Sequence, residues 1–237
     1  MDSITPELLA LGLLQYIVFL LSTTCHEASH ALAAKLGGDP TAFHGGQATL
    51  NPLPHLRREP FGMIVVPLLG LLTGGGLIGW ASAPYDPNWQ LKYPRRAALM
   101  SLAGPAANFT LVLVAALSIR AGLMTGAFRL PERLSSTHLV DAASPGMMEG
   151  AAVFTSVLFS LNLLLGLFNL LPVPPLDGFT AVGMVLPERA AAQYIRLGYR
   201  MGSFAFLGLL LAWRVFEYLY RPALLWSLRL LYPGVIG

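Results

Sequence analysis

The sequence predicts an all-α polytopic membrane protein, and two observations lead to this fold class. The chain has 237 residues, of which 55% are hydrophobic and only 11% are charged, whereas soluble domains carry about 25% charged residues. The apolar residues are gathered in five long uncharged runs. A helix needs about 20 residues to cross a hydrocarbon core about 30 Å thick. We therefore expect about five transmembrane helices.

The five runs define the expected spans. They cover Leu8–Cys25, Pro60–Tyr85, Ala97–Ile119, Gly150–Leu176 and Met201–Trp213. The middle three are long enough to span by themselves. The first becomes long enough if its helix continues to the pair Gly37–Gly38, because glycine commonly ends a helix. The last is short, and it can span only if Arg214 and Glu217 extend to the interface.

The connections complete this fold. Residues 39–59 are rich in glycine and proline, so we expect a short β-hairpin or re-entrant loop after the first helix, with "GQATL" as a short strand. The stretch "RPALLWSLRLLYP" (221–233) predicts a C-terminal interfacial helix with Pro222 in its first turn. We expect one membrane-embedded domain over residues 1–237, with a core at 8–186 and C-terminal helices at 197–233.

The charge pattern favours a lipid partner over nucleic acid. A net charge of +3 is too small to indicate nucleic-acid binding, and basic residues dispersed over loops suit anionic headgroups. With five spans, one face would collect Lys35, Arg57, Arg58, Arg129 and Arg133, and the other Lys92, Arg95, Arg96, Arg189, Arg196 and Arg200. Such an even division gives no orientation under the positive-inside rule.

A group of ionisable residues, whose insertion into a membrane costs free energy, directly follows the first apolar run. The segment His26-Glu27-Ala28-Ser29-His30 matches H-E-x-x-H, and residues i and i+4 share one helical face, so both imidazoles can reach one ion. Glu27 is rotated by about 100°, too far to be a ligand but close enough to meet the attacking water. Ionisable groups at membrane depth are functional candidates because their insertion costs free energy. The pattern predicts a metal site.

The third ligand is expected from a distant segment. Catalytic zinc sites usually have three protein ligands, and Asp177 is the aspartate that follows an apolar run rather than lying in a terminus or polar loop. The preceding helix is interrupted by Pro172, Pro174 and Pro175, and unwound backbone at membrane depth has to line a cavity or be covered by protein. Asp177 could instead serve only as the N-cap of the next helix.

These motifs together resemble those of the site-2 proteases, zinc-dependent proteases that cut within membranes. The resemblance is carried by "HEASH" (26–30), "TLNPLPH" (49–55), "AGPAANF" (103–109) and "NLLPVPPLDG" (169–178). It covers roughly residues 8–186. The chain is similar to a compact form of the family, without an inserted PDZ-like or CBS-like domain.

The resemblance implies specific roles. His26, His30 and Asp177 would hold one Zn2+ per chain, and Glu27 would be the general acid and base. Asn169 and Asn108 would bind substrate. From the residues alone, Asn169 could equally form a hydrogen bond between helices, and Asn108 could belong to a helix-packing face around Gly104.

The expected activity is that of an intramembrane zinc endopeptidase acting on transmembrane protein substrates. It would be a multi-pass protein of a bacterial or archaeal cell membrane. The substrate has to be extended before attack, and residues 46–51 could receive it by β-augmentation. A catalytically silent adaptor and a metal-handling protein are the alternatives, and the oligomeric state is not set by the sequence.

Overall fold

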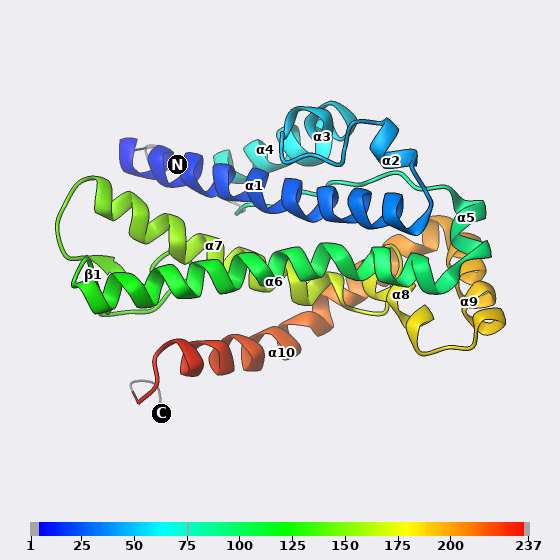
Figure 1. Cartoon of the computed structure of the whole chain (residues 1–237). Coiled ribbons are helices and arrows are strands. Elements are labelled where there is room, and N and C mark those ends of the chain that lie inside the picture. Colours follow the sequence, from blue (N-terminus) through cyan, green and yellow to red (C-terminus); the bar gives the residue numbers. More distant parts are fainter. Residues whose placement is uncertain (1–4, 75, 235–237) are drawn as a thin grey trace. The chain divides into compact units, whose positions relative to one another are not determined.

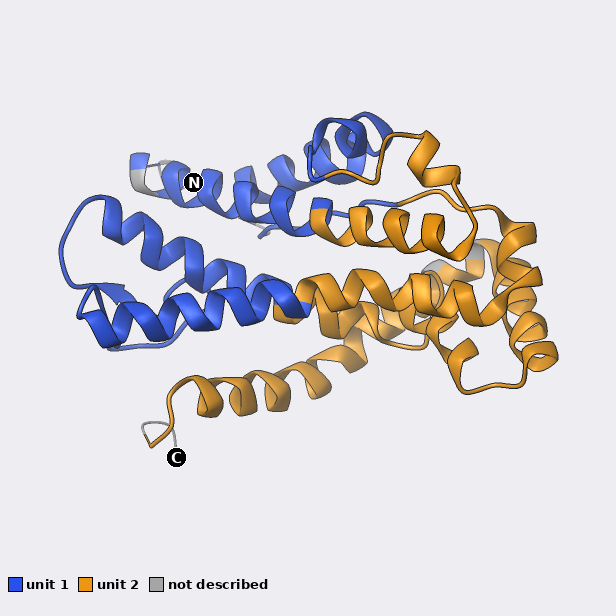
Figure 2. Cartoon of the chain, viewed as in Figure 1, with its two compact units in different colours: residues 1–24, 50–82, 109–162 blue, residues 25–49, 83–108, 163–237 orange. Residues whose placement is uncertain are grey.

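The computed structural model describes residues 5–74 and 76–234, and it is mainly helical (Figure 1). The described chain forms two compact units, each assembled from three separate segments (Figure 2). Unit 1 contains residues 1–24, 50–82 and 109–162, and unit 2 contains residues 25–49, 83–108 and 163–237. Three of the five boundaries fall inside long helices, which are α1 (Pro6–Gly37), α6 (Pro94–Thr125) and α7 (Met147–Asn169).

These three long helices confirm three of the expected membrane spans. Each has the length and the apolar composition needed to cross a bilayer. The helix α1 continues unbroken through the H-E-x-x-H segment to Gly37, as the sequence predicted. Gly38 follows with a φ of +99°, a conformation that favours glycine after a helix end.

The expected second span, Pro60–Tyr85, is wrong as a single crossing helix. Only the π-helical turn η1 (Phe61–Val65) and α4 (Val66–Leu72) are helical, and residues 77–86 have no regular secondary structure. This irregular part runs back along the helix: the Trp80 N–H donates to the Gly62 carbonyl oxygen at 3.1 Å. Gly79 leaves no room for a side chain, because a Cβ there would lie 2.5 Å from that same oxygen. This shape fits a re-entrant segment rather than a crossing.

The expected strand at residues 46–51 is also wrong. These residues form turns and bends, and the described helices of this loop are α2 (Thr41–His44) and α3 (Leu53–Arg58). The strands that the structure does describe lie elsewhere, in unit 1. There β1 (Phe128–Arg129) pairs antiparallel with β2 (Asp141–Ala142), with Phe128 opposite Ala142.

Unit 1 is held together by polar contacts as well as by apolar packing. Tyr16 of α1 donates its hydroxyl hydrogen to the carbonyl oxygen of Met63 at 2.9 Å. Asn162 of α7 is fully buried and donates its amide to the hydroxyl oxygen of Ser22 at 2.8 Å. A buried amide needs such a partner, because an unpaired one costs free energy in an apolar environment.

Unit 2 contains the shorter helices that follow the proline-rich break. They are α5 (Pro87–Lys92), α8 (Asp177–Ala181), η2 (Val182–Met184), α9 (Glu188–Met201), η3 (Gly202–Phe204) and α10 (Ala205–Leu231). The helix α9 is strongly amphipathic and packs against α5 with Ala191 and Ile195 buried (Figure 1). Phe168 at the end of α7 contacts Trp213 and Phe216 of α10, with ring centroids 5.4 and 5.0 Å apart.

The C-terminal region differs from the expectation of a short span followed by a separate interfacial helix. The helix α10 runs continuously from Ala205 to Leu231, and Pro222 lies inside it rather than in a first turn. Its middle carries Arg214, Glu217 and Arg221, and Arg221 forms an ion pair with Glu217 at 2.7 Å. These charges explain why α10 does not resemble the three apolar spans in composition.

One pair of contacts in unit 2 fixes how α1 and α6 are connected. The Trp89 indole N–H and the Arg96 guanidinium both donate to the Gly37 carbonyl oxygen, at 3.1 and 3.2 Å. The C-terminal end of α1 and the N-terminal end of α6 therefore lie together. If α1 and α6 both span a membrane, the chain between these two ends would cross it an even number of times, which the single crossing expected at residues 60–85 does not satisfy. Lys35 consequently lies at the same end as Lys92.

Candidate metal centre

Three ligand-type side chains meet in unit 2. The Nε2 atoms of His26 and His30 are 3.0 Å apart, and the carboxylate of Asp177 reaches both of them. Its Oδ2 lies 3.1 Å from Nε2 of His26, and its Oδ1 lies 3.2 Å from Nε2 of His30. Among the described residues, these three form the cluster of ligand atoms that could hold a metal ion. They are the same three residues that the sequence predicts as ligands.

The helix α1 positions the two histidines as the motif predicts. His26 and His30 are one turn apart, and their rings meet edge to face with centroids 4.6 Å apart. Both residues are buried, at 7% exposure each. Helical spacing alone therefore brings the two imidazoles to one point.

Asp177 reaches the histidines because the chain breaks after α7. The helix α7 ends at Asn169, and the turns at residues 170–176 lead into α8, whose first residue is Asp177. Gly178 allows this turn to close, since a Cβ there would lie 2.1 Å from the Leu170 carbonyl oxygen. The N-cap of α8 is Leu176 and no side chain caps it, so the alternative of Asp177 as an N-cap is wrong.

The hydrogen bonds of the outer ring nitrogens fix which ring atoms face the centre. Nδ1 of His30 lies 2.8 Å from the Met100 carbonyl oxygen, which can only accept, so Nδ1 carries the hydrogen. Nδ1 of His26 lies 2.6 Å from Oδ1 of Asn108 and donates in the same way. With their hydrogens on Nδ1, neutral rings would present the Nε2 lone pairs toward the carboxylate of Asp177. Two such nitrogens and a carboxylate form a donor set that could hold a cation.

The dimensions of the cluster fit a tetrahedral metal ion. Ligands bound at about 2.05 Å in tetrahedral geometry lie roughly 3.3 Å apart, close to the 3.0–3.2 Å found here. Space for the ion is left by Gly104 of α6. A Cβ at Gly104 would lie 2.5 Å from Nε2 of His26 and 2.4 Å from Nε2 of His30.

Glu27 lies beside the cluster without belonging to it. It is 6% exposed, and its carboxylate is not among the clustered ligand atoms. Its position between the two histidine ligands places it on the same helical turn. Glu27 is therefore a buried carboxylate adjacent in sequence to His26 and outside the ligand cluster.

The two asparagines named from the sequence have different surroundings. Asn108 is fully buried and contacts His26, so it borders the metal centre. Asn169 is half-buried at the end of α7, and its amide donates to the Leu165 carbonyl oxygen one turn back at 3.1 Å. Neither contact reveals a substrate, and their substrate-binding roles stay predictions.

Sequence reasoning missed Met100 and Ser101 at the centre, and it named Gly104 only for helix packing. Ser101 donates its hydroxyl hydrogen to the backbone carbonyl oxygen of Asp177. Met100, Gly104 and Asn108 occupy positions i, i+4 and i+8 of α6, which form one stripe of a helix, and Ser101 lies next to Met100. That spacing was visible in the sequence, but nothing in the sequence showed that the stripe faces the histidines.

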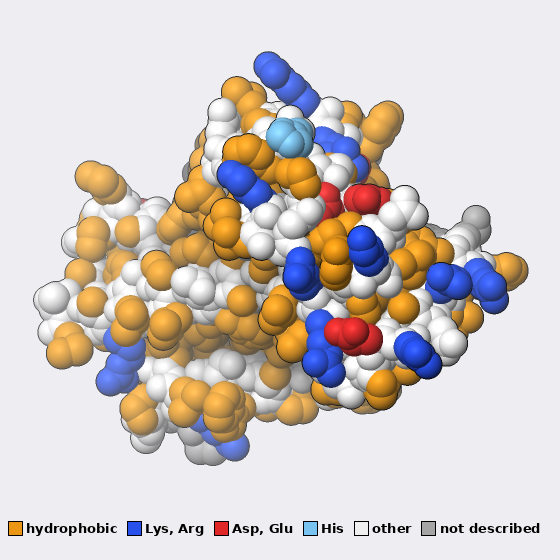
Figure 3. Space-filling view, turned by 45° about the vertical axis from the view of Figure 1, so that its right-hand side comes forward, with side chains coloured by type: hydrophobic (Ala, Val, Ile, Leu, Met, Phe, Trp, Pro, Cys, Tyr) orange, Lys and Arg blue, Asp and Glu red, His pale blue; other side chains and the backbone are white. Residues whose placement is uncertain are grey.

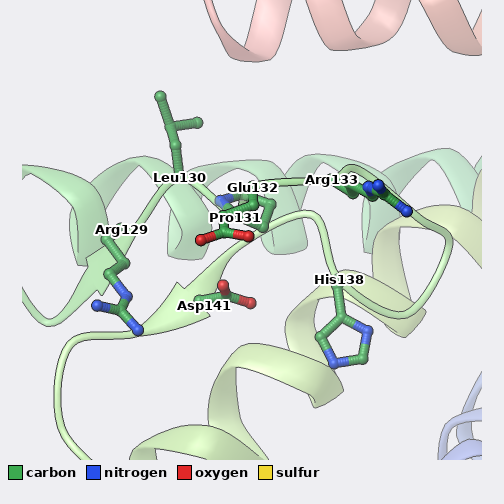
Figure 4. Close-up of a pocket in the computed structure, with 7 residues that line it drawn as sticks. All are labelled: Arg129, Leu130, Pro131, Glu132, Arg133, His138 and Asp141. Atoms are coloured by element: carbon green, nitrogen blue, oxygen red, sulfur yellow. The ribbon is translucent and has the colours of Figure 1, made fainter.

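Unit 1 contains a second polar site, a pocket of about 410 Å³ in the loop between α6 and α7. Its lining residues are Arg129, Leu130, Pro131, Glu132, Arg133, His138 and Asp141 (Figure 4). Figure 4 shows the carboxylates of Glu132 and Asp141 extending toward the same space, while Leu130 points away from it. Most of these side chains are exposed, and they do not form a metal-ligand cluster among the described residues.

Comparison with known proteins identifies the family. A model of peptidase family M50 matches residues 15–210. The "Putative zinc metalloprotease YwhC" of Bacillus subtilis is 36% identical over 187 residues, covering 77% of this chain and 74% of that protein. The "Putative zinc metalloprotease Rip2" of Mycobacterium tuberculosis is 33% identical over 192 residues, covering 78% of this chain and 64% of that protein. No solved structure matches. The chain belongs to peptidase family M50, the site-2 protease family.

Proposed function

We propose that this chain is an intramembrane zinc endopeptidase that hydrolyses peptide bonds within or near transmembrane segments of other proteins. The observation that carries the proposal is the convergence of His26, His30 and Asp177 on one point, with Glu27 beside it. The two histidines lie in an apolar helix long enough to span a bilayer. A site of this kind is costly at membrane depth and serves little purpose unless the chemistry takes place there.

The cofactor is Zn2+, the metal in the names of both relatives. The donor set of two imidazole nitrogens and one carboxylate is one that catalytic zinc sites use, and it leaves one position open. When bound, zinc lowers the pKa of water and polarises a carbonyl group. The single cluster in the described residues corresponds to one ion per chain.

Glu27 performs the proton transfers in this scheme. Its carboxylate takes a proton from the attacking water and later delivers that proton to the amine leaving group. A glutamate can do this because it is buried beside the ligands but not consumed as a ligand. The carbonyl carbon of the peptide gains the oxygen of water, and the carbon–nitrogen bond breaks.

The site lies inside the bilayer and is reached from one side. Eleven residues separate His26 from Gly37, the last residue of α1. At about 1.5 Å per residue, the site is roughly 16 Å from that helix end. Water has to reach this depth, and the broken backbone at residues 170–176 offers polar groups that can line its path.

The basic residues of unit 2 support an orientation with this end in the cytosol. Lys35, Lys92, Arg95, Arg96, Arg189, Arg196 and Arg200 are all exposed. Lysine and arginine side chains gather toward the right of the face drawn in Figure 3. The positive-inside rule places such a group on the cytoplasmic side. Five spans would have divided the basic residues evenly between the two membrane faces. Because the end of α1 lies beside the start of α6, the basic residues near both ends belong to the same face instead.

The substrate is a membrane protein whose cleaved segment is locally extended. A helix hides its peptide bonds, so hydrolysis requires it to unwind first. Residues 46–51 do not form the strand that was expected to receive the substrate. Residues 77–86 lie outside the described helices and strands, so this irregular segment is the better candidate to pair with an extended substrate by β-augmentation.

The proposal is tested by cleavage of single-span substrate proteins in reconstituted liposomes. The wild type should cut at least one member of a substrate panel, and Glu27→Gln should abolish cleavage while keeping its zinc. Glu149→Gln, at an exposed glutamate in the first turn of α7, is the control and should remain active. Equal cleavage by the wild type and Glu27→Gln contradicts the mechanism. A zinc-loaded wild type that binds but never cuts these substrates supports the adaptor instead.

A further inference from the structure

One face of helix α6 carries residues that contact all three proposed metal ligands, and we call it the supporting face. Met100, Gly104 and Asn108 follow one another at intervals of four residues, and Ser101 lies beside Met100. Each of them meets a ligand: Met100 and Asn108 bind the outer nitrogens of the histidines, and Ser101 binds the backbone of Asp177. This face is rigid because helical geometry fixes the spacing.

Among the two residues that support the histidines, Asn108 differs from Met100 because its contact is made by a side chain. Its Oδ1 lies 2.6 Å from Nδ1 of His26, and the residue is fully buried. His30 receives the equivalent support from the main-chain carbonyl of Met100, which no substitution can remove. The orientation of His26 therefore depends on the identity of residue 108, whereas that of His30 does not.

We propose that Asn108 is a positioning residue that orients His26 for zinc by accepting its Nδ1–H, rather than a residue that binds substrate. The inference rests on the proposed function, since it concerns the same metal centre. Fixing Nδ1–H on His26 forces the lone pair onto Nε2, the atom that faces His30 and Asp177. Partners of this kind raise the affinity of histidine ligands for metal.

The acceptor role and a substrate role make opposite demands on residue 108. Holding His26 requires only an acceptor oxygen, so a carboxylate at this position serves as well as an amide. Stabilising the oxyanion of a substrate requires the amide N–H donors, which an ionised carboxylate does not have. The variant Asn108→Asp therefore separates the two roles. Asn108→Leu has a side chain of similar size but lacks both the acceptor oxygen and the N–H donors.

The test measures metal binding in the absence of substrate. Purified protein in detergent is titrated with Co2+, followed by the visible absorption of the bound ion, and Zn2+ affinity is obtained by competition. We expect Asn108→Leu to weaken binding by about 10–100-fold and to alter the cobalt spectrum. Asn108→Asp should restore both to within a few-fold of the wild type, and it should also retain cleavage.

Asn162→Leu is the matched control. Asn162 is also fully buried in an apolar helix and bonded to another helix, but its partner is Ser22 rather than a metal ligand. Thermal unfolding of the metal-free proteins reports the general cost of losing a buried amide. We expect Asn162→Leu to lower thermal stability without changing metal affinity.

Two results overturn the inference. If Asn108→Leu binds cobalt as tightly as the wild type, Asn108 does not position His26. If Asn108→Asp keeps its metal but loses cleavage as fully as Asn108→Leu, the amide donors act on substrate. Should Asn108→Leu fail to fold, Asn108→Asp and Asn108→Ala decide by the same two readouts. A wild type that binds no metal refutes the proposed function as well, so the two failures are distinguishable.

Discussion

His26 and Asp177 are 151 residues apart in the sequence, yet Nε2 of the histidine lies 3.1 Å from Oδ2 of the aspartate. Their meeting requires α1 to remain helical through the H-E-x-x-H segment and α7 to stop at Asn169. The aspartate then enters at the first residue of α8. The account of the site therefore depends on one unbroken helix and one interrupted helix.

Removal of the distant ligand should release the metal. Asp177→Ala leaves two imidazoles, and two ligands hold zinc far more weakly than three. Loss of an outer partner alone costs about 10–100-fold in affinity, so the loss of a ligand should exceed that range. Zinc content after dialysis, measured by mass spectrometry, should fall well below one equivalent per chain. Asp141→Ala, in the charged pocket of unit 1, should keep its zinc. Full occupancy in Asp177→Ala would exclude this residue as a ligand.

A single methyl group at Gly104 should block the centre. A Cβ there would lie within 2.5 Å of both Nε2 atoms, the space that the ion requires. We expect Gly104→Ala to lower zinc affinity by at least about tenfold, because alanine competes directly for that volume. Gly150→Ala in α7 is the control, since a Cβ there meets no atom within 4 Å. Unchanged zinc binding in Gly104→Ala would mean that the ion lies elsewhere.

The proposed orientation can be checked by labelling cysteines in whole cells. In a Cys25→Ser background, Arg95→Cys and Arg196→Cys should react with a membrane-impermeant maleimide only after lysis. Both residues are exposed at the basic end of unit 2. Met124→Cys, near the opposite end of α6 and 83% exposed, should react in intact cells. The reverse labelling pattern would place the basic end outside and contradict the positive-inside assignment.

Acid should weaken the loop that follows α1. Burial alone would raise the pKa of Asp39, but hydrogen bonds from the Thr41 hydroxyl and from the backbone N–H groups of Asp86 and Thr41 outweigh it and lower the pKa below 3.8. The ionised form therefore stabilises the fold at neutral pH, and this stabilisation is lost as pH falls below 3.8.

The comparison of wild type with Asp39→Asn measures this contribution. Hydrogen bonds to a charged group contribute about 1.5–3 kcal/mol, so Asp39→Asn should lower the thermal unfolding temperature at pH 7. The difference between the two proteins should shrink as the pH approaches 3. A difference that is constant with pH would show that the charge of Asp39 does not contribute.

The metal ligands were accessible to sequence reasoning because each leaves a local signal. His26 and His30 are spaced by one helical turn, and Asp177 follows three closely spaced prolines that together cannot continue a helix. The supporting face of α6 was not accessible. Met100 acts through its carbonyl oxygen, which every residue has, and Gly104 acts by the absence of a side chain.

The membrane topology was predicted less well than the site, and the reason is physical. Residues 60–85 are apolar enough to cross a bilayer, and composition does not distinguish one crossing from a helix that turns back. The reversal occurs near Gly74 and Gly76, which both have positive φ values, and it is stabilised by close packing at Gly79. The contacts of Gly37 with Trp89 and Arg96 reveal this topology only once the fold is known.

The central claim is that His26, His30 and Asp177 hold one zinc ion, and X-ray absorption at the zinc edge tests it most directly. The purified protein should contain one zinc with two imidazole nitrogens and carboxylate oxygen at about 2.0–2.2 Å. The imidazole signal should be reduced by half in His30→Ala if any metal is retained. A wild-type protein with no bound zinc, or with zinc whose spectrum is unchanged by substitution of these residues, would contradict the account.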